Sequence, residues 1–275
     1  MSTQPSTPLA VGVGGFGAVG RTVAGRLDGA GIPGLRLAAV SARDVARAEA
    51  AVARFHRPVP VLALADLAGV ADVVVECAPA ALLREVAEPA LRAGRKLVVI
   101  SVGALLGAPD LVELARAHGG QIIVPSGAIL GLDAVTAAAE GEIRSVRMVT
   151  RKPVRGLEGA PYLRERGISL EGLCEPLRVF EGSAKDGAAG FPANVNVAAA
   201  LGLAGIGPEQ TRLEIWADPT LTRNTHRIEV VADSASFSMT IENVPSEENP
   251  RTGRITALSV LAALRKLTSP LRIGT

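Results

Sequence analysis

The stretch Val11–Gly20, VGVGGFGAVG, is half glycine and lies close to the start of the sequence. Gly12, Gly14 and Gly17 form the pattern G-x-G-x-x-G between an expected strand and an expected helix. In that context the first glycine permits a tight turn and the second lets a pyrophosphate approach the backbone, while the third lets helix and strand pack closely. The free N–H groups of the helix N-terminus then attract the phosphates. The stretch therefore predicts a dinucleotide-binding loop.

Aliphatic segments alternate with helical ones on both sides of this loop. The expected strands are Pro8–Gly14, Leu35–Val40, Val73–Glu76, Lys96–Ile100 and Gln121–Val124, and the expected helices are Ala18–Leu27, Asp44–Phe55, Ala80–Ala93 and Asp110–Ala117. Such alternation is typical of βαβ units with right-handed crossovers. We therefore predict an α/β fold whose first domain, residues 1–130, is a Rossmann doubly wound parallel sheet that binds a dinucleotide.

The pattern changes after residue 130. The expected strands are Val146–Arg151, Leu177–Glu181, Leu213–Trp216, Arg227–Val231 and Ser236–Glu242, and the expected helices are Gly131–Glu140, Val195–Leu203 and Gly253–Leu267. This succession predicts an α+β substrate domain with a mostly antiparallel sheet, over residues 131–245. In the last helix Ile255, Leu258, Leu261, Leu264 and Leu267 are expected to share one apolar face. Residues 246–275 are therefore expected to pack back on the first domain.

Composition excludes several classes of protein. Of 275 residues 48% are hydrophobic and only 3% aromatic, which suits an aliphatic core between helices and a parallel sheet. A net charge of +2 argues against a nucleic-acid-binding protein. Cys77 and Cys174 lie far apart, so we expect neither a disulfide framework nor a metal site, and a cytoplasmic location. The polar first ten residues predict no signal peptide, and no apolar run is long enough to span a membrane.

Contacts with the cofactor are expected first from the glycine loop. The loop residues concerned are Gly12, Gly14, Gly15, Phe16, Gly17, Ala18 and Val19. At the end of the second strand an acid would favour NAD, whereas an arginine would accept the 2′-phosphate of NADP. Ser41 and Arg43 stand there, so the sequence favours NADP over NAD. Asp44 either approaches the ribose or caps the next helix.

Later strand ends are expected at the same edge, because ligands gather at the carboxyl ends of parallel strands. Small residues follow three of the strands and would leave room for a flat nicotinamide ring. They are Cys77, Ala78, Ser101, Ser126 and Ala128. We interpret Cys77 as a small buried thiol rather than a reactive one.

Candidates for the chemistry lie in the second half of the chain. His226 follows a polar turn at the start of a strand, and an imidazole suits acid–base work near neutral pH. Arg151 and Lys152 end another strand and are candidates for binding substrate carboxylates, with solvation at the sheet edge as the alternative. Asn194 and Asn196 open an apolar helix, Asn194 as its expected N-cap.

Six segments, taken in order, resemble the L-aspartate dehydrogenases. They are GVGGFGAVG (12–20), IIVPSGAILGLDAV (122–135), TRKP (150–153), FPANVNVAAALGLAGIG (191–207), NTHRIEV (224–230) and ENPRTGRITALSVLAAL (248–264). The resemblance implies oxidative deamination of L-aspartate to iminoaspartate, then oxaloacetate and ammonia, with NAD or NADP. It also implies a link to NAD biosynthesis.

The same resemblance implies roles for three residues. The catalytic histidine of the family falls on His226, its cofactor-contacting alanine on Ala128, and its asparagine before the apolar helix on Asn196. Ser41 and Arg43 depart from the acid found in some members, and the segment Gly156–Gly172 does not align. The implied mechanism transfers the α-hydrogen as hydride, with His226 as the base for the ammonium, the water, or both.

Other functions are compatible with the same motifs. One is a dehydrogenase or reductase of another amino or keto dicarboxylate, which would differ in its need for ammonia. Another is an amine dehydrogenase acting on a more distant substrate, because pockets change faster than folds. A third is a non-catalytic dinucleotide sensor, which would bind cofactor without turnover. The apolar surfaces expected on sheet and helices also suit a homodimer.

Overall fold

The computed structural model describes residues 7–191, 195–246, 248 and 253–274. The chain divides into two compact units, each built from several segments. Unit 1 comprises Met1–Ser101, Ala108–Pro125 and Ala257–Arg272, and unit 2 comprises Val102–Gly107, Ser126–Thr256 and Ile273–Thr275. The expected division was 1–130, 131–245 and a tail, 246–275, that packs back on the first domain. Of that tail 257–272 lies in unit 1, whereas 102–107 lies in unit 2 and was expected in the first domain.

Unit 1 contains a five-stranded sheet in the order β2-β1-β3-β4-β5, and every pairing in it is parallel. Its strands are β1 (Leu9–Gly14), β2 (Leu35–Ser41), β3 (Val73–Glu76), β4 (Lys96–Val99) and β5 (Gln121–Ile123). The chain runs from β1 outward to β2 and then returns to β3 on the other side of β1. The topological switch point of the sheet, where ligands bind in such folds, therefore lies between β1 and β3. The predicted doubly wound parallel sheet is confirmed.

Helices cover both faces of this sheet. They are α1 (Ala18–Leu27), α2 (Val45–Val52), α3 (Leu67–Val70), α4 (Leu83–Arg92), α6 (Asp110–His118) and α11 (Ile255–Thr268). Side chains of α1 and α11, among them Val23 and Val260, share a buried cluster with the strands. On the other face, Leu67 of α3 and Val86 of α4 approach Gly14. The predicted helix at 80–93 begins with a separate 3₁₀ turn, Ala80–Leu82.

The buried face of α11 differs from the predicted one. Ile255 and Leu258 are exposed, Leu258 by 51%, whereas Ala257, Val260 and Leu264 are buried. Steps of three residues fall short of a full turn of 3.6, so a series spaced strictly by three drifts around the helix. The real apolar stripe mixes steps of three and four.

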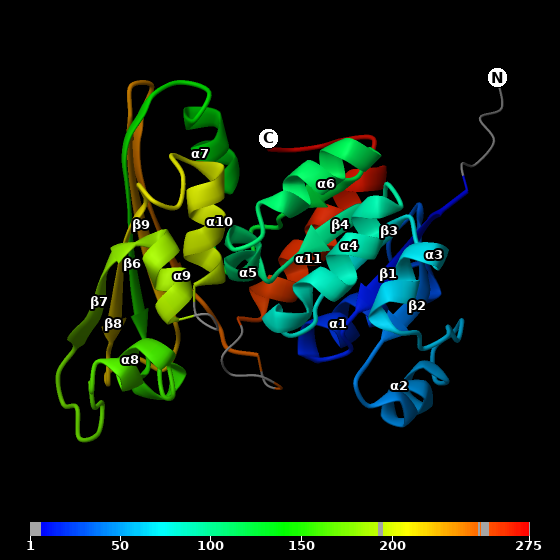
Figure 1. Cartoon of the computed structure of the whole chain (residues 1–275), viewed down its shortest axis with the longest axis horizontal. Helices are drawn as coiled ribbons and strands as arrows, with labels where there is room; N and C mark the ends of the chain where they lie inside the picture. Colours follow the sequence, from blue (N-terminus) through cyan, green and yellow to red (C-terminus); the bar gives the residue numbers. More distant parts are fainter. Residues whose placement is uncertain (1–6, 192–194, 247, 249–252, 275) are drawn as a thin grey trace. The chain divides into compact units, whose positions relative to one another are not determined.

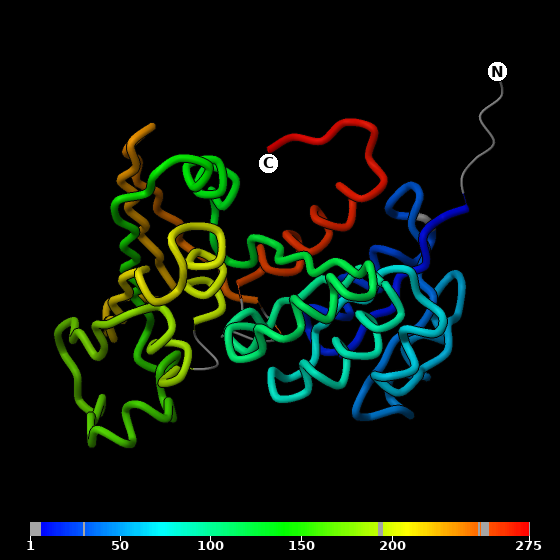
Figure 2. The backbone as a smooth tube through the Cα atoms, turned by 45° about the horizontal axis from the view of Figure 1, so that its top comes forward, coloured from blue at the N-terminus to red at the C-terminus, as the bar shows by residue number. Residues whose placement is uncertain are grey.

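Unit 2 contains a second five-stranded sheet, in the order β10-β9-β6-β8-β7. Its strands are β6 (Ile143–Lys152), β7 (Leu177–Ser183), β8 (Arg212–Ala217), β9 (Thr225–Ala232) and β10 (Ser236–Glu242). Only β6 and β8 pair in parallel; the other pairings are antiparallel, as predicted. β9 and β10 form a hairpin, which appears in orange in Figure 2.

Helices cover one face of this second sheet. They are α7 (Leu132–Ala138), α8 (Pro161–Glu165), α9 (Ala184–Gly190) and α10 (Asn196–Ala204), and α5 (Val102–Leu106) packs against α9 and α10. Figure 1 shows α7, α9 and α10 on the same side of β6 and β9. The helices α5, α8 and α9 were not predicted. The segment 156–172 that did not align contributes Leu157 and Leu163 to the core, so it is a packed part of this unit.

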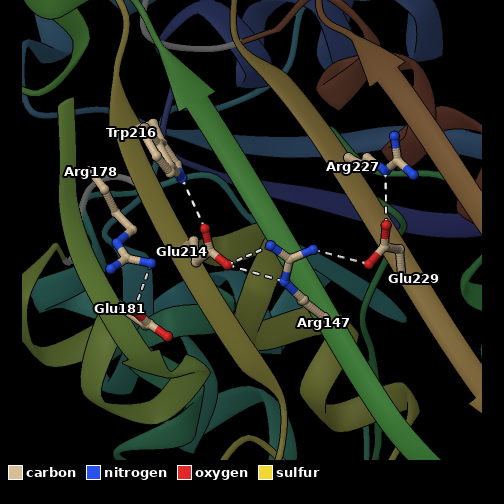
Figure 3. A network of polar contacts seen from close by, with 7 residues as sticks. All are labelled: Arg147, Arg178, Glu181, Glu214, Trp216, Arg227 and Glu229. Atoms are coloured by element: carbon tan, nitrogen blue, oxygen red, sulfur yellow. Dashed lines mark hydrogen bonds and ion pairs between the residues drawn. The ribbon is translucent and has the colours of Figure 1, made fainter. Parts of the chain in front are cut away.

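The opposite face of the second sheet carries charged side chains, as Figure 3 shows. Arg147 on β6 donates hydrogen bonds to Glu214 on β8, at 2.6 and 3.0 Å, and to Glu229 on β9, at 3.0 Å. Trp216 Nε1 donates to Glu214 as well, at 3.0 Å. Since successive side chains of a strand point to opposite faces, these ion pairs fix which residues of β6 point toward the helices.

In the part of the chain that the structure describes, no helix is both long and apolar enough to cross a membrane.

Candidate functional site

The glycine loop of unit 1 lies at the switch point of the sheet. Gly15 has φ +108°, and its N–H donates to the carbonyl oxygen of Ser41 at 3.0 Å. A Cβ on Gly15 would stand only 2.5 Å from the carbonyl oxygen of Cys77. The loop after β1 is therefore pressed against the loop after β3, and only glycine fits this tight turn.

The next two glycines, Gly17 and Gly20, complete a G-x-G-x-x-G pattern that begins at Gly15, whereas the predicted pattern began at Gly12. Gly17 caps α1 without a side-chain hydrogen bond, and a Cβ there would meet nothing within 4 Å. This open backbone beside a helix N-terminus fits a pyrophosphate. A Cβ on Gly20 would overlap the carbonyl oxygen of Gly15. Close packing of helix and strand, predicted for Gly17, is thus met by Gly20.

Gly12 and Gly14 belong to strand β1 itself. A Cβ on Gly12 would meet Ala71 at 3.2 Å, and one on Gly14 would meet side chains of helices at 3.4 Å. Because Gly12 and Gly14 have no side chain, the residues of the covering helices can pack closely on β1. The sequence holds two overlapping G-x-G-x-x-G patterns, and the end of β1 at Gly14 selects the second, Gly15-x-Gly17-x-x-Gly20.

The remaining predicted residues of this loop and of β2 are placed as follows. Phe16 packs edge to face on Phe55, with ring centroids 6.4 Å apart, and Ala18 and Val19 form the first turn of α1. Ser41 is buried at the carboxyl end of β2, and Arg43 is exposed just beyond it.

Asp44 caps the following helix. Its carboxylate accepts from the backbone N–H of Arg47 at 3.1 Å. Of the two roles left open for Asp44, the structure therefore shows the helix cap.

Sequence reasoning missed Glu76, a buried carboxyl group at the end of β3. It accepts hydrogen bonds from the hydroxyl and the backbone N–H of Ser101, both at 2.9 Å, and from the N–H of Ile100 at 3.1 Å. Burial raises the pKa of Glu76, although these hydrogen bonds act in the opposite direction. Glu76 thus ties the carboxyl ends of β3 and β4 together, and the Ser101 hydroxyl is committed to it.

Cys77 and Ala78 follow Glu76. Burial, and then the neighbouring Glu76, raise the pKa of the Cys77 thiol. A thiol needs its thiolate form to react as a nucleophile. Cys77 is therefore an unreactive thiol, and Ala78 beside it is buried.

In unit 2 the segment after β5 is held by an asparagine that the sequence did not single out. Asn243 is buried and donates from Nδ2 to the carbonyl oxygen of Ala128 at 2.9 Å. The carbonyl oxygen of Ser126 accepts from Ile129 N–H at 3.2 Å, which closes a turn. Ser126 and Ala128 are partly buried within this turn.

A polar cluster ends the helix-covered face of the sheet in unit 2. Thr150 and Lys152 of β6 point to that face, and His226 of β9 stands directly opposite Thr150. Thr150 Oγ1 lies 3.1 Å from His226 Nδ1. His226 is 2% exposed and Lys152 4%. Along the same two strands this face is otherwise built from Val146, Met148, Ile228 and Val230.

The surroundings of this cluster shift both bases toward their neutral forms. Burial, and then the positive charge of Lys152, lower the pKa of His226 to about 3. Burial lowers the pKa of Lys152 to about 8. Desolvation favours the uncharged form of any cationic group. His226 is therefore neutral at pH 7, while Lys152 is close to the range in which it loses its proton.

Arg151 lies on the opposite face of the sheet from Lys152. Its guanidinium group stands 3.3 Å from Asp218 and 4.9 Å from the centre of the Trp216 ring. Strand alternation thus separates the two neighbouring cations, and Lys152 alone shares a face with His226.

Asn196 is the first residue of α10. Its Oδ1 accepts from the backbone N–H of Gly103 at 2.9 Å, which links α10 to α5. The helix N-cap is Val195. Asn194, the N-cap expected from the sequence, lies outside the described residues.

Within the described ranges no group of three or more His, Cys, Asp or Glu residues is suited to hold a metal ion.

Comparison with known proteins gives the same assignment over nearly the whole chain. Residues 133–267 match the family described as aspartate dehydrogenase, C-terminal, and residues 15–125 match that described as homoserine dehydrogenase, NAD binding domain. The chain is 58% identical over 267 residues to L-aspartate dehydrogenase 3 of Bordetella bronchiseptica, covering 97% of this chain and 98% of that one. It is 56% identical over 270 residues to L-aspartate dehydrogenase of Bradyrhizobium diazoefficiens, covering 98% and 95%.

A solved structure of aspartate dehydrogenase from Thermotoga maritima has the same fold. Its TM-score is 0.70 over 97% of this chain and 99% of that one, at 23% sequence identity. The sequence identities to the two bacterial enzymes, over almost complete lengths, decide the family. The chain belongs to the L-aspartate dehydrogenase family and is an NAD(P)-dependent oxidoreductase.

Proposed function

We propose that this protein catalyses the oxidative deamination of L-aspartate to iminoaspartate, which water converts to oxaloacetate and ammonia, and also the reverse reaction. The observation that carries the proposal is the burial of an imidazole and an ammonium group together, His226 and Lys152, at the end of an otherwise apolar sheet face. Membership of the family supplies the identity of the substrate. Unit 1 holds the glycine loop proposed to bind the cofactor, and unit 2 holds His226 and Lys152, which are proposed to act on the substrate.

His226 acts as the acid–base group. The bound nicotinamide supplies the hydride acceptor. The substrate amine must first lose a proton, because an ammonium has no lone pair with which to expel the α-hydrogen as hydride. The neutral imidazole of His226 accepts that proton and releases it to solvent. The neutral ring then accepts a proton from the water that attacks the imine carbon. General acid–base help of this kind is worth about 10²- to 10⁴-fold in rate.

Lys152 binds a carboxylate of the substrate. An anion beside the buried ammonium lowers the cost of its charge and raises the pKa of Lys152 from about 8. The same anion offsets the repulsion between Lys152 and a protonated His226, so the pKa of His226 rises from about 3. Binding of a dicarboxylate substrate therefore makes His226 a stronger base for the proton transfer. Ser126, Asn194 and Asn196 stand as further substrate contacts proposed from the sequence. Arg151, also predicted as one, points to the other face of the sheet and pairs with Asp218, so it is not retained.

The cofactor proposal extends to individual residues. We assign the pyrophosphate to the backbone around Gly15 and Gly17, and the 2′-phosphate of NADP to Arg43 beside Ser41. NADP is thus preferred over NAD. The remaining proposed contacts are Phe16, Ala18, Val19, Cys77, Ala78, Ser101, Ala128 and Asn196. Gly12 and Gly14, also predicted as contacts, lie within β1 and face packed side chains, so they are not retained.

An absorbance assay at the NAD(P)H band tests the reaction. Purified protein should oxidise the reduced cofactor in the presence of oxaloacetate and ammonia together. His226→Ala should lose about 10²- to 10⁴-fold in kcat while cofactor affinity stays constant. Oxidation without ammonia would instead identify a keto-acid reductase. Cofactor binding without turnover on any amino or keto acid would identify a sensor.

We further propose a cytoplasmic homodimer. Both cysteines are free thiols, as in a reducing compartment. Light scattering on the purified chain should give twice the mass of 28.2 kDa.

A further inference from the structure

The hydroxyl group of Thr150 is the feature of unit 2 that the proposed reaction leaves unexplained. Thr150 Oγ1 and His226 Nδ1 are 3.1 Å apart, and both side chains are buried. The two residues stand opposite each other in the antiparallel pair of β6 and β9. Two residues earlier on β6 the same face carries Met148, and two before that Val146, so packing alone would be served by an apolar side chain such as valine.

We propose that Thr150 is a positioning residue whose hydroxyl oxygen accepts a hydrogen bond from Nδ1–H of His226 and so holds the tautomer that exchanges protons at Nε2. The proposal rests on the acid–base role proposed above for His226. Which ring nitrogen carries the proton is set by the hydrogen bond that the other one makes.

The direction of the hydrogen bond follows from what a base must do. An imidazole that accepts a proton at Nε2 carries hydrogen on both nitrogens afterwards, so the partner of Nδ1 has to be an acceptor. If the hydroxyl donated to Nδ1, the neutral ring would carry its proton on Nε2 and could not accept another there. With Thr150 as acceptor, the contact is the same before and after proton transfer. The contact with Thr150 engages Nδ1, and we therefore assign the exchange of protons to the other ring nitrogen, Nε2.

The location of Thr150 makes it a rigid support. A β-branched side chain has restricted χ1 rotation, so the position of its hydroxyl is well defined. Both partners belong to strands rather than loops, and β6 is paired on both sides, with β9 and with β8. Groups held by regular structure in this way keep a catalytic side chain oriented more closely than loops do.

Two substitutions at position 150 separate orientation from packing. Thr150→Val keeps the shape and removes the hydroxyl, whereas Thr150→Ser keeps the hydroxyl. We expect Thr150→Val to lower kcat for aspartate oxidation about ten- to a hundred-fold, with KM for aspartate and Kd for the cofactor within about twofold of wild type. Thr150→Ser should recover most of this loss. In a His226→Ala background, Thr150→Val should cause no further loss, because residues that act as a unit are not additive.

A readout independent of turnover is ¹⁵N NMR of the imidazoles in the free, full-length protein. The chain has three histidines, and comparison with His226→Ala assigns the signals of His226. Wild type and Thr150→Ser should show Nδ1 protonated and Nε2 unprotonated, and Thr150→Val should show a mixture or the opposite tautomer. If Thr150→Val does not fold, Thr150→Cys replaces it, since a thiol is only a weak hydrogen-bond acceptor.

The outcomes distinguish this proposal from the one on which it rests. Wild-type kcat in Thr150→Val, with His226→Ala inactive, would overturn the role of Thr150 and leave that of His226. A proton on Nε2 in the wild-type spectrum would also overturn it. Near-normal turnover in His226→Ala would overturn the acid–base role of His226 itself, and the positioning role with it.

Discussion

A buried imidazole beside a buried ammonium is costly to the folded state, and the cost depends on pH. The pKa of His226 falls from 6.5 to about 3, first through burial and then through Lys152. In the unfolded chain His226 returns to its ordinary pKa. Between pH 3 and 6.5 the unfolded state therefore binds more protons than the folded state, so stability rises with pH and is lost as pH falls below 6.5. Lys152 is protonated in both states over this range and does not contribute to the slope.

We predict that in His226→Gln, whose side chain cannot become charged, the unfolding free energy depends less on pH below 6.5. From pH 6.5 to 5 the wild type should lose about 1.5 kcal/mol more unfolding free energy than the variant. Urea unfolding followed by fluorescence of Trp216 measures the loss, because Trp216 is the single tryptophan and belongs to the sheet that holds His226. His118→Gln, at an exposed histidine, is the matched control and should keep the wild-type slope. Equal slopes for wild type and His226→Gln would show that His226 is not held neutral by the fold.

At the scale of elements, periodicity predicted both sheets, but it did not reveal which residues meet across the strands. His226 could be singled out from the sequence, whereas its partner Thr150 depends on the register between β6 and β9, which no local pattern contains. Lys152 was considered together with Arg151 as one basic pair. The alternation of Val146, Met148 and Thr150 along β6 was the signal that Lys152 points inward. Glu76 was expected as the last residue of its strand, but its contacts with Ile100 and Ser101 join residues far apart in the sequence, which no local pattern reveals.

The glycine fingerprint gives a prediction for helix α1. Gly20→Ala would bring a methyl group onto the carbonyl oxygen of Gly15 and push the helix away from the loop. We expect it to cost about 1 to 3 kcal/mol of unfolding free energy and to weaken cofactor binding at least tenfold. Gly25→Ala is the matched control on the same helix, because a Cβ there meets nothing within 4 Å. It should stabilise the protein by about 0.5 to 1 kcal/mol and leave cofactor affinity unchanged. Normal cofactor affinity in Gly20→Ala would contradict the assignment of Gly15, Gly17 and Gly20 as the three glycines of the cofactor-binding pattern.

At the scale of the whole molecule, the two sheets are both built largely from aliphatic residues but differ in which of their faces are buried. The parallel sheet of unit 1 is buried on both faces and presents its carboxyl ends to a ligand. The sheet of unit 2 has helices on one face and ion pairs on the other (Figure 3), so its end positions can carry a polar cluster without disturbing the core. The sequence predicted one parallel and one mostly antiparallel sheet, because the hydrophobic pattern of strands and helices can be recognised in a single sequence. The sequence led us to expect that the C-terminal tail returns to the first domain, and residues 257–272 lie in unit 1. It did not predict that 102–107 belongs to unit 2, since that depends on contacts between distant parts of the chain.

We have proposed that the choice between NAD and NADP is made at the end of β2 rather than at the reacting atoms. Arg43 is exposed just beyond the buried Ser41, and the carboxylate of Asp44 is engaged as the N-cap of α2. We predict that Arg43→Ala weakens NADP binding about ten- to a hundred-fold, the value of one charge-assisted hydrogen bond, and leaves NAD binding within about twofold. Calorimetric titration of each cofactor measures this. Arg36→Ala, at an exposed arginine near the opposite end of β2, is the matched control and should change neither affinity. An equal loss for both cofactors would mean that Arg43 supports the loop in general, and the preference for NADP would then have to come from another residue.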